Sequence, residues 1–295
     1  MTLSPRAVVV NRRTEYEELL AAHGTRGQAE FFLGTRGLSL TGVEERHLRV
    51  RQALREVAGH LPVEWRRTSV ERSELPSFLF TPEDIVVVVG QDGLVANVSK
   101  YLTGQPVVGV NPDPVSIPGV LVPWPAQALA DVLREVTAGR GRRLSRTMVE
   151  AEVDDGRRLQ ALNEIYFGHR THQSSRYLLT APGPRREEQS SSGLIVGSGT
   201  GATGWLASLS RIQGQAPLPT PDAPQLAWFV REAWPSPGTG TTLTSGRLDA
   251  AVALEVEART DLVCFGDGLE SDALTVGYGQ RVSFRIAGHR LHTVV

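Results

Sequence analysis

The sequence predicts a two-domain protein in which an open α/β domain with a parallel sheet is joined to an antiparallel β-sandwich. Its 295 residues correspond to about two domains of roughly 150 residues each. Apolar runs alternate with helical patterns in the first part of the chain, and short strands separated by glycine-containing turns dominate the rest. We therefore expect an α/β domain over residues 1–135 and a β-sandwich domain over residues 136–295.

The elements of the first domain are expected from the spacing of its apolar residues. They are, in order, a strand at 7–10, a helix at 41–59, a strand at 85–89, a helix at 94–102, a strand at 107–110 and a helix at 126–136. Thr41 and Glu44 have the spacing of a capping box at the start of the first helix. The strand at 85–89 is the clearest, because its β-branched residues stand between Pro82 and Gly90 and suit a strand covered on both faces.

Short runs of strand-forming residues characterise the second domain. They predict strands at 146–153, 161–167, 175–180, 194–196, 250–259, 262–265 and 281–286. Dipeptides that favour turns, such as Asp-Gly and Pro-Gly, separate several of these runs. Many short strands in succession are typical of an antiparallel sandwich.

The charge balance, the single cysteine and the lack of long apolar runs limit the partners and the compartment that we expect for this protein. The 31 basic and 32 acidic residues give a net charge of -1, so no overall field favours a polyanion and we do not expect nucleic acid as a partner. The one cysteine, Cys264, cannot form an intramolecular disulfide. The first residues lack the apolar core of a signal peptide, and no apolar run approaches the ~20 residues that cross a bilayer. We therefore expect a cytoplasmic protein with no membrane partner.

The turn after the clearest strand contains residues that could bind a phosphate or take a proton from a hydroxyl. Gly90, Gln91, Asp92 and Gly93 lie where a helix is expected to begin, and ligands bind at this edge of open α/β sheets. Small residues let backbone N–H groups approach a phosphate. A carboxylate at this place is repulsive unless it binds a metal or takes a proton from a hydroxyl nucleophile. The simpler alternative is a tight strand-to-helix turn in which Asp92 is the N-cap.

These residues resemble the NAD kinase family, whose signature at this place is Gly-Gly-Asp-Gly-Thr and is shared by the diacylglycerol and sphingosine kinases. Further blocks are similar to the family in the same order, namely residues 105–111, 161–165, 193–205 and 265–268. The resemblance implies the family's fold, an α/β nucleotide-binding domain joined to a β-sandwich substrate-binding domain. It also implies a homodimer or homotetramer that uses ATP and Mg²⁺ to phosphorylate NAD.

The resemblance implies a role for each matching residue of the first domain. Asp92 would be the catalytic base that acts on a ribose hydroxyl, and Gly90 and Gly93 would make room for the phosphates of the donor. Gln91 and Asn111 would lie beside them in the nucleotide site. We expect no metal-ligating set of protein side chains.

In the second domain, the resemblance implies an acceptor site. Asn163 and Glu164 would hold the acceptor nucleotide, since an amide bonds to a base edge or ribose and a carboxylate accepts from two adjacent hydroxyls. The other residues implied here are Thr200, Gly201 and Thr203 along the cleft, Trp205 as an aromatic face for a base, and Asp267 near the acceptor ribose.

The sequence departs from the family pattern near the donor residues. Gln91 stands for the second glycine of the signature, Leu94 for its threonine, and residues 111–114, Asn-Pro-Asp-Pro, for a glycine-containing loop. We predict an ATP-dependent kinase that phosphorylates a ribose-type hydroxyl of NAD or a similar nucleoside-like acceptor. The alternative is a catalytically altered protein of this type that binds nucleotides or acts as a regulator.

Residues 199–204 also fit the G-x-G-x-x-G pattern of a dinucleotide-binding turn. They follow the strand expected at 194–196, and Asp222 lies at a suitable distance beyond them. However, prolines between residues 217 and 224 fill the place where a crossover helix should run into a second strand. This pattern makes an NAD-dependent oxidoreductase a weaker alternative than the kinase.

Overall fold

The apolar run at residues 85–89 forms the centre of a parallel sheet in the computed structural model, which describes residues 5–183, 185–214 and 217–295. Strand β3 (Asp84–Val89) is buried along its whole length. It pairs in parallel with β1 (Arg6–Asn11) on one side and with β4 (Pro106–Val110) on the other. A strand covered on both faces and on both edges explains why every one of its residues is apolar after Asp84.

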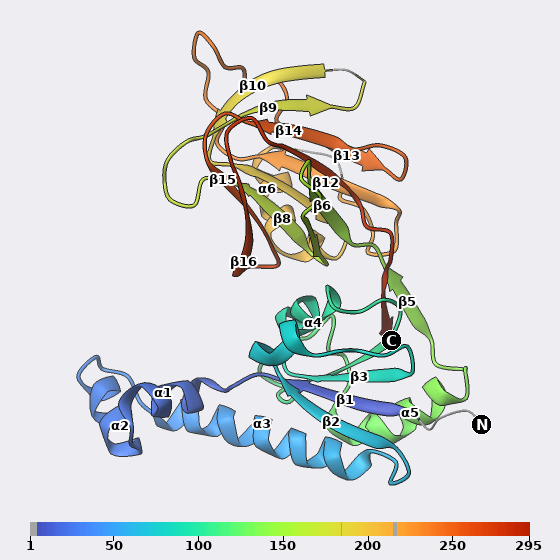
Figure 1. The fold of residues 1–295 in the computed structure, drawn as a ribbon. Helices are drawn as coiled ribbons and strands as arrows, with labels where there is room; N and C mark the ends of the chain where they lie inside the picture. Colours follow the sequence, from blue (N-terminus) through green and yellow to red (C-terminus); the bar gives the residue numbers. More distant parts are fainter. Residues whose placement is uncertain (1–4, 184, 215–216) are drawn as a thin grey trace. The chain divides into compact units, whose positions relative to one another are not determined.

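This sheet belongs to unit 1, which comprises residues 1–144 and 292–295. Its strand order is β2-β1-β3-β4-β18-β5 (Figure 1), where β2 is Arg66–Glu71, β5 is Arg143–Arg146 and β18 is Leu291–Val294. The neighbouring pairs from β2 to β18 are all parallel. Unit 1 is therefore the open α/β structure that the sequence predicts.

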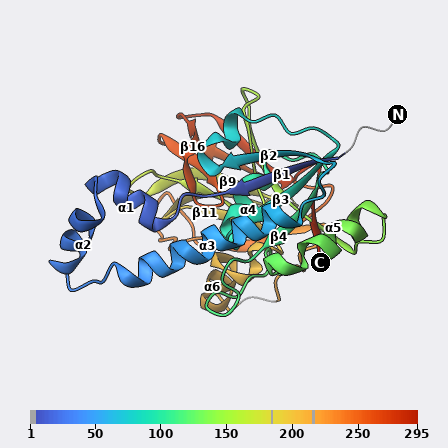
Figure 2. The same cartoon turned by 90° about the horizontal axis from the view of Figure 1, so that it is seen from below.

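Helices cover both faces of the unit 1 sheet. Helices α3 (Thr41–His60) and α5 (Leu129–Thr137) pack on the face that carries Val87, and Figure 2 shows both of them from below the sheet. Helix α4 (Asp92–Ser99) contacts the 3-10 helix η1 (Arg72–Ser77), and both lie on the opposite side in Figure 1. A short 3-10 helix, η2 (Ala126–Ala128), leads into α5.

The helices before β2 differ in part from the prediction. Helix α3 begins at Thr41, but Leu40 occupies its cap position and no side chain caps it. The predicted capping box is therefore wrong, because Thr41 lies inside the first turn. Two further helices, α1 (Glu15–His23) and α2 (Arg26–Gly34), precede α3 and share a small apolar cluster that includes Leu33.

The last strand of the chain completes the sheet of unit 1. Strand β18 lies between β4 and β5 and runs parallel to β4. Val294 is 2% exposed, and its carbonyl oxygen accepts a hydrogen bond from the indole N–H of Trp124 at 3.1 Å. Residues from the two ends of the sequence are thus parts of one hydrophobic core.

Unit 2, residues 145–291, contains two sheets in which all described pairs are antiparallel. The first sheet has the order β10 (Arg185–Ser191), β9 (Ser175–Ala181), β14 (Leu254–Ala258), β17 (Arg281–Ile286), β6 (Val149–Val153), β7 (Arg158–Ala161). The second has the order β13 (Ser245–Asp249), β12 (Gln225–Val230), β11 (Leu194–Ser198), β8 (Glu164–Gly168), β15 (Leu262–Gly266), β16 (Leu269–Val276).

A shared apolar core joins the two sheets of unit 2. Phe167 of β8 meets Tyr177 of β9 with ring centroids 5.6 Å apart and Phe284 of β17 at 6.0 Å, both edge to face. This is the arrangement that aromatic quadrupoles favour. The sandwich predicted from the alternating strands is confirmed.

Helix α6 (Trp205–Ile212) covers the outer face of the second sheet through Leu206 and Leu209. A short 3-10 helix, η3 (Gly201–Thr203), connects β11 to it. One strand was expected over residues 161–167, but the structure has two, β7 and β8, with a break at residues 162–163. Of the candidate site residues, Asn163 lies in this break and Glu164 directly follows it.

In the part of the chain that the structure describes, no helix combines the length and the apolar character needed to cross a membrane.

Candidate functional site

Gly90 and Gln91 connect β3 to α4 in unit 1, and Asp92 and Gly93 begin the helix. The N–H of Gly90 donates to the carbonyl oxygen of Val110 at 3.0 Å, so the turn begins beside the end of β4. A Cβ at Gly90 would lie 3.1 Å from Leu94 Cδ2, whereas a Cβ at Gly93 would meet nothing within 4 Å. The turn therefore has open space at Gly93, and the neighbouring Gln91 is exposed.

Asp92 is the first residue of α4 and is half-buried. Its Oδ2 accepts the N–H of Val120 at 3.0 Å, and its Oδ1 accepts the N–H of Leu121 at 2.8 Å. Gln91 occupies the N-cap position, so the alternative in which Asp92 is the N-cap is wrong. The carboxylate instead holds the loop that follows β4, and each of its oxygens keeps a second lone pair.

Asn111 holds the same loop near its start. Its Nδ2 donates to the carbonyl oxygen of Ile117 at 2.7 Å, and its Oδ1 accepts the N–H of Asp113 at 2.9 Å. Asp92 and Asn111 are therefore brought together through the loop of residues 111–121. Both side chains have structural hydrogen bonds there, which the sequence did not indicate.

In unit 2, Asp267 shapes the break between β7 and β8. Its carboxylate accepts the N–H groups of Leu162 at 2.8 Å and Asn163 at 2.7 Å, and its own N–H donates to the carbonyl oxygen of Glu164 at 3.0 Å. Asp267 has a φ of 52°, a left-handed conformation that aspartate adopts more readily than most residues. These bonds place Asn163, Glu164 and Asp267 side by side.

Glu164 has an unusual electrostatic environment. It is half-buried at the first position of β8, and among the described residues its carboxylate has no hydrogen-bond donor. Burial, and secondarily the negative charge of Asp267, raises the pKa of Glu164 to about 7. A buried carboxylate without donors costs free energy, so this group is suited to accept hydrogen bonds from a ligand.

Glycines leave room above Asn163 and Glu164. A Cβ at Gly201 would lie 2.7 Å from the carbonyl oxygen of Asn163 and 2.9 Å from Glu164 Oε2. A Cβ at Gly197 would lie 2.6 Å from the same carbonyl oxygen. Both contacts are too close for a larger residue, so glycine at 201 keeps the Glu164 carboxylate uncovered on that side.

Thr200 brings a buried hydroxyl to the same cluster. Its Oγ1 has no partner among the described residues, although Thr200 is 5% exposed. Its N–H donates to Ser198 Oγ at 3.1 Å, and Ser198 Oγ donates to the carbonyl oxygen of Leu162 at 2.5 Å. Because buried hydroxyls are usually paired, the free Oγ1 indicates a place for a ligand or a water molecule.

Thr203 and Trp205 lie at the start of α6. Thr203 is exposed, and its Oγ1 donates to the carbonyl oxygen of Thr200 at 3.4 Å. The Trp205 ring is parallel to the Tyr166 ring within 8°, with centroids 6.3 Å apart, and the Arg231 guanidinium lies 5.3 Å from the Trp205 centroid. Trp205 is 36% exposed, so part of its aromatic surface is accessible.

Tyr166, Arg231 and Ser198 are not among the site residues expected from the sequence. Tyr166 lies two residues after Glu164 on β8, and residues at this spacing share a face of a strand, so the pattern of the strand could have indicated it. Ser198 and Arg231 have no such signal, because their contacts depend on chain segments far apart in sequence.

The residues do not form a metal site of the usual kind. Over the described ranges, no group of three or more His, Cys, Asp or Glu side chains is placed to hold a metal ion. Mg²⁺ retains several waters and often uses only one or two carboxylates together with substrate phosphates. The residues therefore fit a magnesium ion only if most of its ligands come from a bound phosphate compound and water.

The G-x-G-x-x-G pattern at residues 199–204 has a structural explanation. Strand β11 before it pairs antiparallel with both β8 and β12, whereas a dinucleotide-binding turn requires a parallel crossover unit. A Cβ at Gly199 would lie 2.1 Å from the carbonyl oxygen of Thr220. Glycine is thus required there by the close approach of another loop.

Comparison with known proteins gives one informative finding. No protein-family model matches the sequence, and no curated protein matches it. Among solved structures, the chain is similar to yeast NADH kinase complexed with NADH, with a TM-score of 0.63 and 15% sequence identity over 99% of this chain and 84% of that one. At this identity the likeness shows the fold alone, which is similar to that of this kinase.

Proposed function

We propose that this protein is an ATP-dependent phosphotransferase that phosphorylates a ribose-type hydroxyl of NAD(H) or a similar nucleoside-like acceptor. The observation that carries the proposal is the pair of Glu164 and Thr200 in unit 2, because among the described residues the Glu164 carboxylate has no hydrogen-bond donor and Thr200 Oγ1 has no partner. The similarity in fold to a kinase that was solved with NADH supports it, as does the aspartate at the carboxyl end of β3.

The unit 2 cluster suits an acceptor that carries adjacent hydroxyls. Two neighbouring ribose hydroxyls can donate to the two oxygens of Glu164, which lack donors from the described residues. The side-chain amide of Asn163 makes no hydrogen bond to a described residue, so it is available to a base edge or a ribose. The free Thr200 Oγ1 offers both a donor and an acceptor beside them.

Trp205 suits the base of such an acceptor. Stacking of a base on an aromatic side chain contributes ~1–3 kcal/mol in nucleic-acid complexes, and a third of the Trp205 surface is exposed. Arg231 beside the ring would add a cation close to the phosphates of a dinucleotide. These two residues would therefore select for an aromatic, anionic acceptor.

The turn between β3 and α4 suits the donor. Open space at Gly93 would allow phosphates to approach the backbone at the start of α4. ATP with Mg²⁺ would supply the phosphoryl group, and the cation would neutralise charge on the phosphates. Asp92 would accept the proton of the acceptor hydroxyl on a free lone pair, while the hydroxyl oxygen bonds to the γ-phosphorus and ADP leaves with the electrons of the broken P–O bond.

A co-substrate screen tests this proposal. Purified protein is incubated with ATP, Mg²⁺ and either NAD or NADH, and the product mass is examined for a gain of one phosphoryl group. We expect Asp92→Asn to lower kcat by at least about 100-fold and to leave the NAD dissociation constant unchanged within a few-fold. Wild-type turnover in this variant would refute the role of Asp92 as a base.

The controls separate loss of the base from disturbance of the loop. An amide offers one acceptor oxygen in place of two, so Asp92→Asn also weakens the contacts to Val120 and Leu121. Asn111→Ala disturbs the same loop and keeps the carboxylate, and its kcat should fall far less. Asp131→Asn, on the exposed side of α5, removes the same charge and should behave as wild type.

A nucleotide-binding regulator is the second candidate function. It is favoured by the two backbone N–H groups on Asp92 and by Leu94, which is buried where the kinase signature has a threonine. Such a protein would bind NAD, NADH or ATP in a calorimeter without producing ADP. Binding together with ADP release dependent on the acceptor would exclude this candidate.

A further inference from the structure

Two adjoining cavities lie in unit 1, away from the residues discussed so far. Their volumes are about 490 Å³ and 530 Å³, and they share the lining residues Asn11, Arg51, Leu54 and Glu71. Asn11 and Glu71 are the last residues of β1 and β2 and are paired in register. The two cavities therefore meet at the carboxyl ends of two parallel strands, the edge at which open α/β sheets bind ligands, and the second continues along β2 to Arg67.

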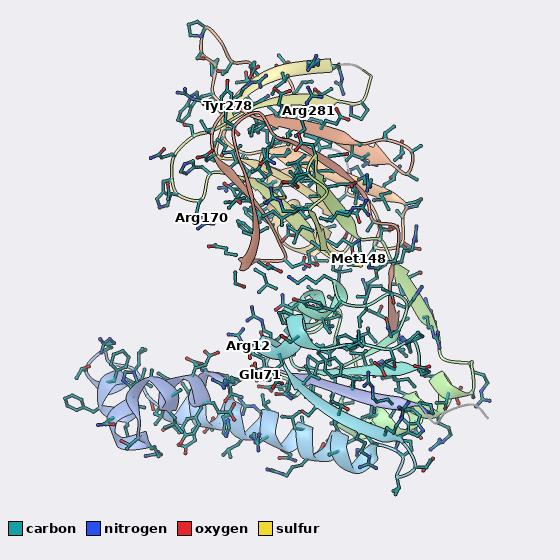
Figure 3. The ribbon with its side chains drawn as sticks, viewed as in Figure 1. Arg12, Glu71, Met148, Arg170, Tyr278 and Arg281 are labelled. Carbon is teal, nitrogen blue, oxygen red and sulfur yellow. The ribbon has the colours of Figure 1, made fainter. Side chains whose placement is uncertain are left out.

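Arginines outnumber carboxylates around these cavities. The charged residues that line one or both are Arg12, Arg13, Arg51, Arg55, Arg67, Glu17, Glu71 and Glu74. Figure 3 labels Arg12 and Glu71, which lie close together at the ends of β1 and β2. With five guanidinium groups and three carboxylates, the lining has a positive balance.

The carboxylates of this lining are occupied by backbone donors. Glu17 accepts the N–H of Thr14 at 2.9 Å in the capping box of α1. Glu71 accepts the N–H groups of Ser73 at 3.1 Å and Arg13 at 3.4 Å, and Glu74 accepts the N–H of Glu71 at 2.7 Å. These backbone bonds use part of the accepting capacity of the carboxylates. Against the effect of burial, the bonds from Ser73 lower the pKa of the Glu71 carboxyl, and the charge of Arg13 still acts on Glu71 and lowers this pKa further.

Several of the arginines keep free donors. Arg67 is used structurally, because its guanidinium donates to the carbonyl oxygens of residues 58, 61 and 62 near the end of α3. By contrast, the side chains of Arg13 and Arg55 make no hydrogen bond or ion pair with any described residue. Arg12 and Arg51 have only long contacts, at 3.5 Å to Glu18 and at 4.0 Å to Glu17.

One wall of the second cavity is apolar. It is lined by Val9 of β1, by Leu54, Val57 and Ala58 of α3 and by Leu61 just after the helix. Its accessible part is Leu54 and Ala58, since the other three side chains are buried. An inorganic anion would gain nothing from this wall. A ligand with an anionic end and a flat or apolar body would contact both the arginines and the wall.

The cavities are separate from the turn that contains Asp92. They lie beside α3, on the face of the sheet where α3 packs, whereas α4 and the turn before it lie on the opposite side. None of residues 90–93 lines either cavity. A ligand bound beside α3 would therefore leave that turn free.

We propose that the α3 groove, defined as the two cavities described above, is a second ligand site for a phosphate-bearing molecule of the nucleotide class. Phosphate oxygens accept from Arg13 and Arg55, whose forked guanidinium groups suit such anions, with Arg12 and Arg51 able to turn from their long ion pairs. The apolar wall receives the base. The volume of each cavity lies in the range of small-molecule sites.

Arginine-directed modification locates the ligand in the full-length protein. Phenylglyoxal labels exposed arginines, and peptide mass mapping with and without ADP reports which are protected. We expect ADP to protect Arg13 and Arg55 but not Arg134, which is exposed on α5 outside the groove. Labelling of Arg13 and Arg55 that is unchanged by saturating ADP would refute the site, even if ADP binds elsewhere on the chain.

Affinity measurements test the chemistry of the groove. By calorimetry, a double variant Arg13→Gln and Arg55→Gln should lose at least about tenfold in affinity for ADP at this site, whereas Arg134→Gln should match wild type. Pyrophosphate should bind more weakly than ADP, and equal affinities would refute the contribution of the apolar wall. Both replaced arginines are exposed, so an unchanged melting temperature confirms that the double variant folds.

The test of this second ligand site is independent of the test of phosphotransferase activity. The groove is tested by protection and binding without an acceptor, and the kinase is tested by product formation. Loss of ADP affinity in a double variant that still phosphorylates NAD would locate the ligand in the groove. Wild-type ADP affinity in the double variant would refute it.

Discussion

Replacing Glu164 by glutamine should remove a pH dependence of stability that unit 2 carries around neutral pH. In the folded protein, burial and the charge of Asp267 raise the pKa of Glu164 to about 7, compared with an ordinary value of 4.5. Between these values the folded state binds more protons than the unfolded state, so the free energy of unfolding falls as pH rises. From about pH 5 to about pH 8, this group alone should lower the free energy of unfolding by roughly 2–3 kcal/mol.

Urea unfolding at a series of pH values measures this effect. The difference in unfolding free energy between Glu164→Gln and wild type should grow with pH, in favour of the variant, and level off above pH 7. Glu255→Gln, which replaces an exposed carboxyl on β14, is the matched control and should keep the wild-type profile. A difference between Glu164→Gln and wild type that does not change with pH would refute the reasoning.

The raised pKa of Glu164 also predicts how the affinity for an acceptor depends on pH. Hydroxyls that donate to Glu164 favour its ionised form, so the affinity for NAD should decrease as pH falls below 7. The decrease should approach about tenfold per pH unit well below the pKa. In Glu164→Gln the affinity should be weaker and independent of pH over this range, and calorimetry at pH 6 and pH 8 distinguishes the two behaviours.

Two further predictions concern unit 1. Gly109→Ala should lower the unfolding free energy by about 3 kcal/mol, because its Cβ would lie 2.0 Å from the carbonyl oxygen of Leu121. Gly59→Ala is the control, since a Cβ there would meet nothing within 4 Å. Urea unfolding midpoints measure both variants, and midpoints equal to wild type in both would contradict the prediction. In a chain truncated after Leu291, the free energy of unfolding should fall by at least about 2 kcal/mol, because the burial of Val294 is lost. The backbone amides of β4 should then exchange with solvent faster, and unchanged hydrogen exchange there would show that β18 is dispensable.

Local sequence signals predicted much of the fold because they depend on neighbouring residues. The β-branched run at 85–89 is a buried strand, and the helix expected at 41–59 is α3. The cap of α3 and the break between β7 and β8 were not predicted correctly. Local patterns could not predict the break, because Asp267, which bonds to the N–H of Asn163 from 104 residues away, ends the strand by a tertiary contact.

The candidate site was accessible to sequence reasoning only as a set of residue types. The sequence placed Asp92 at the end of a strand, since strand and turn patterns are local. That its carboxylate bonds to residues 120 and 121 depends on how the loop after β4 folds back. Likewise, the sequence marked Glu164, but the pKa of its carboxyl is set by burial and by a residue on another hairpin.

The sequence by itself determined the alternation of strands and helices over residues 85–137 and the residue types of the turn at the end of β3, because periodicity and turn preference act over a few residues. Only the tertiary structure decided which distant groups meet. It placed β18 from the end of the chain beside β4, and it brought Arg13 and Arg55 to the same groove as β2. Such meetings follow from packing and electrostatics between segments far apart in sequence, and no local pattern records them.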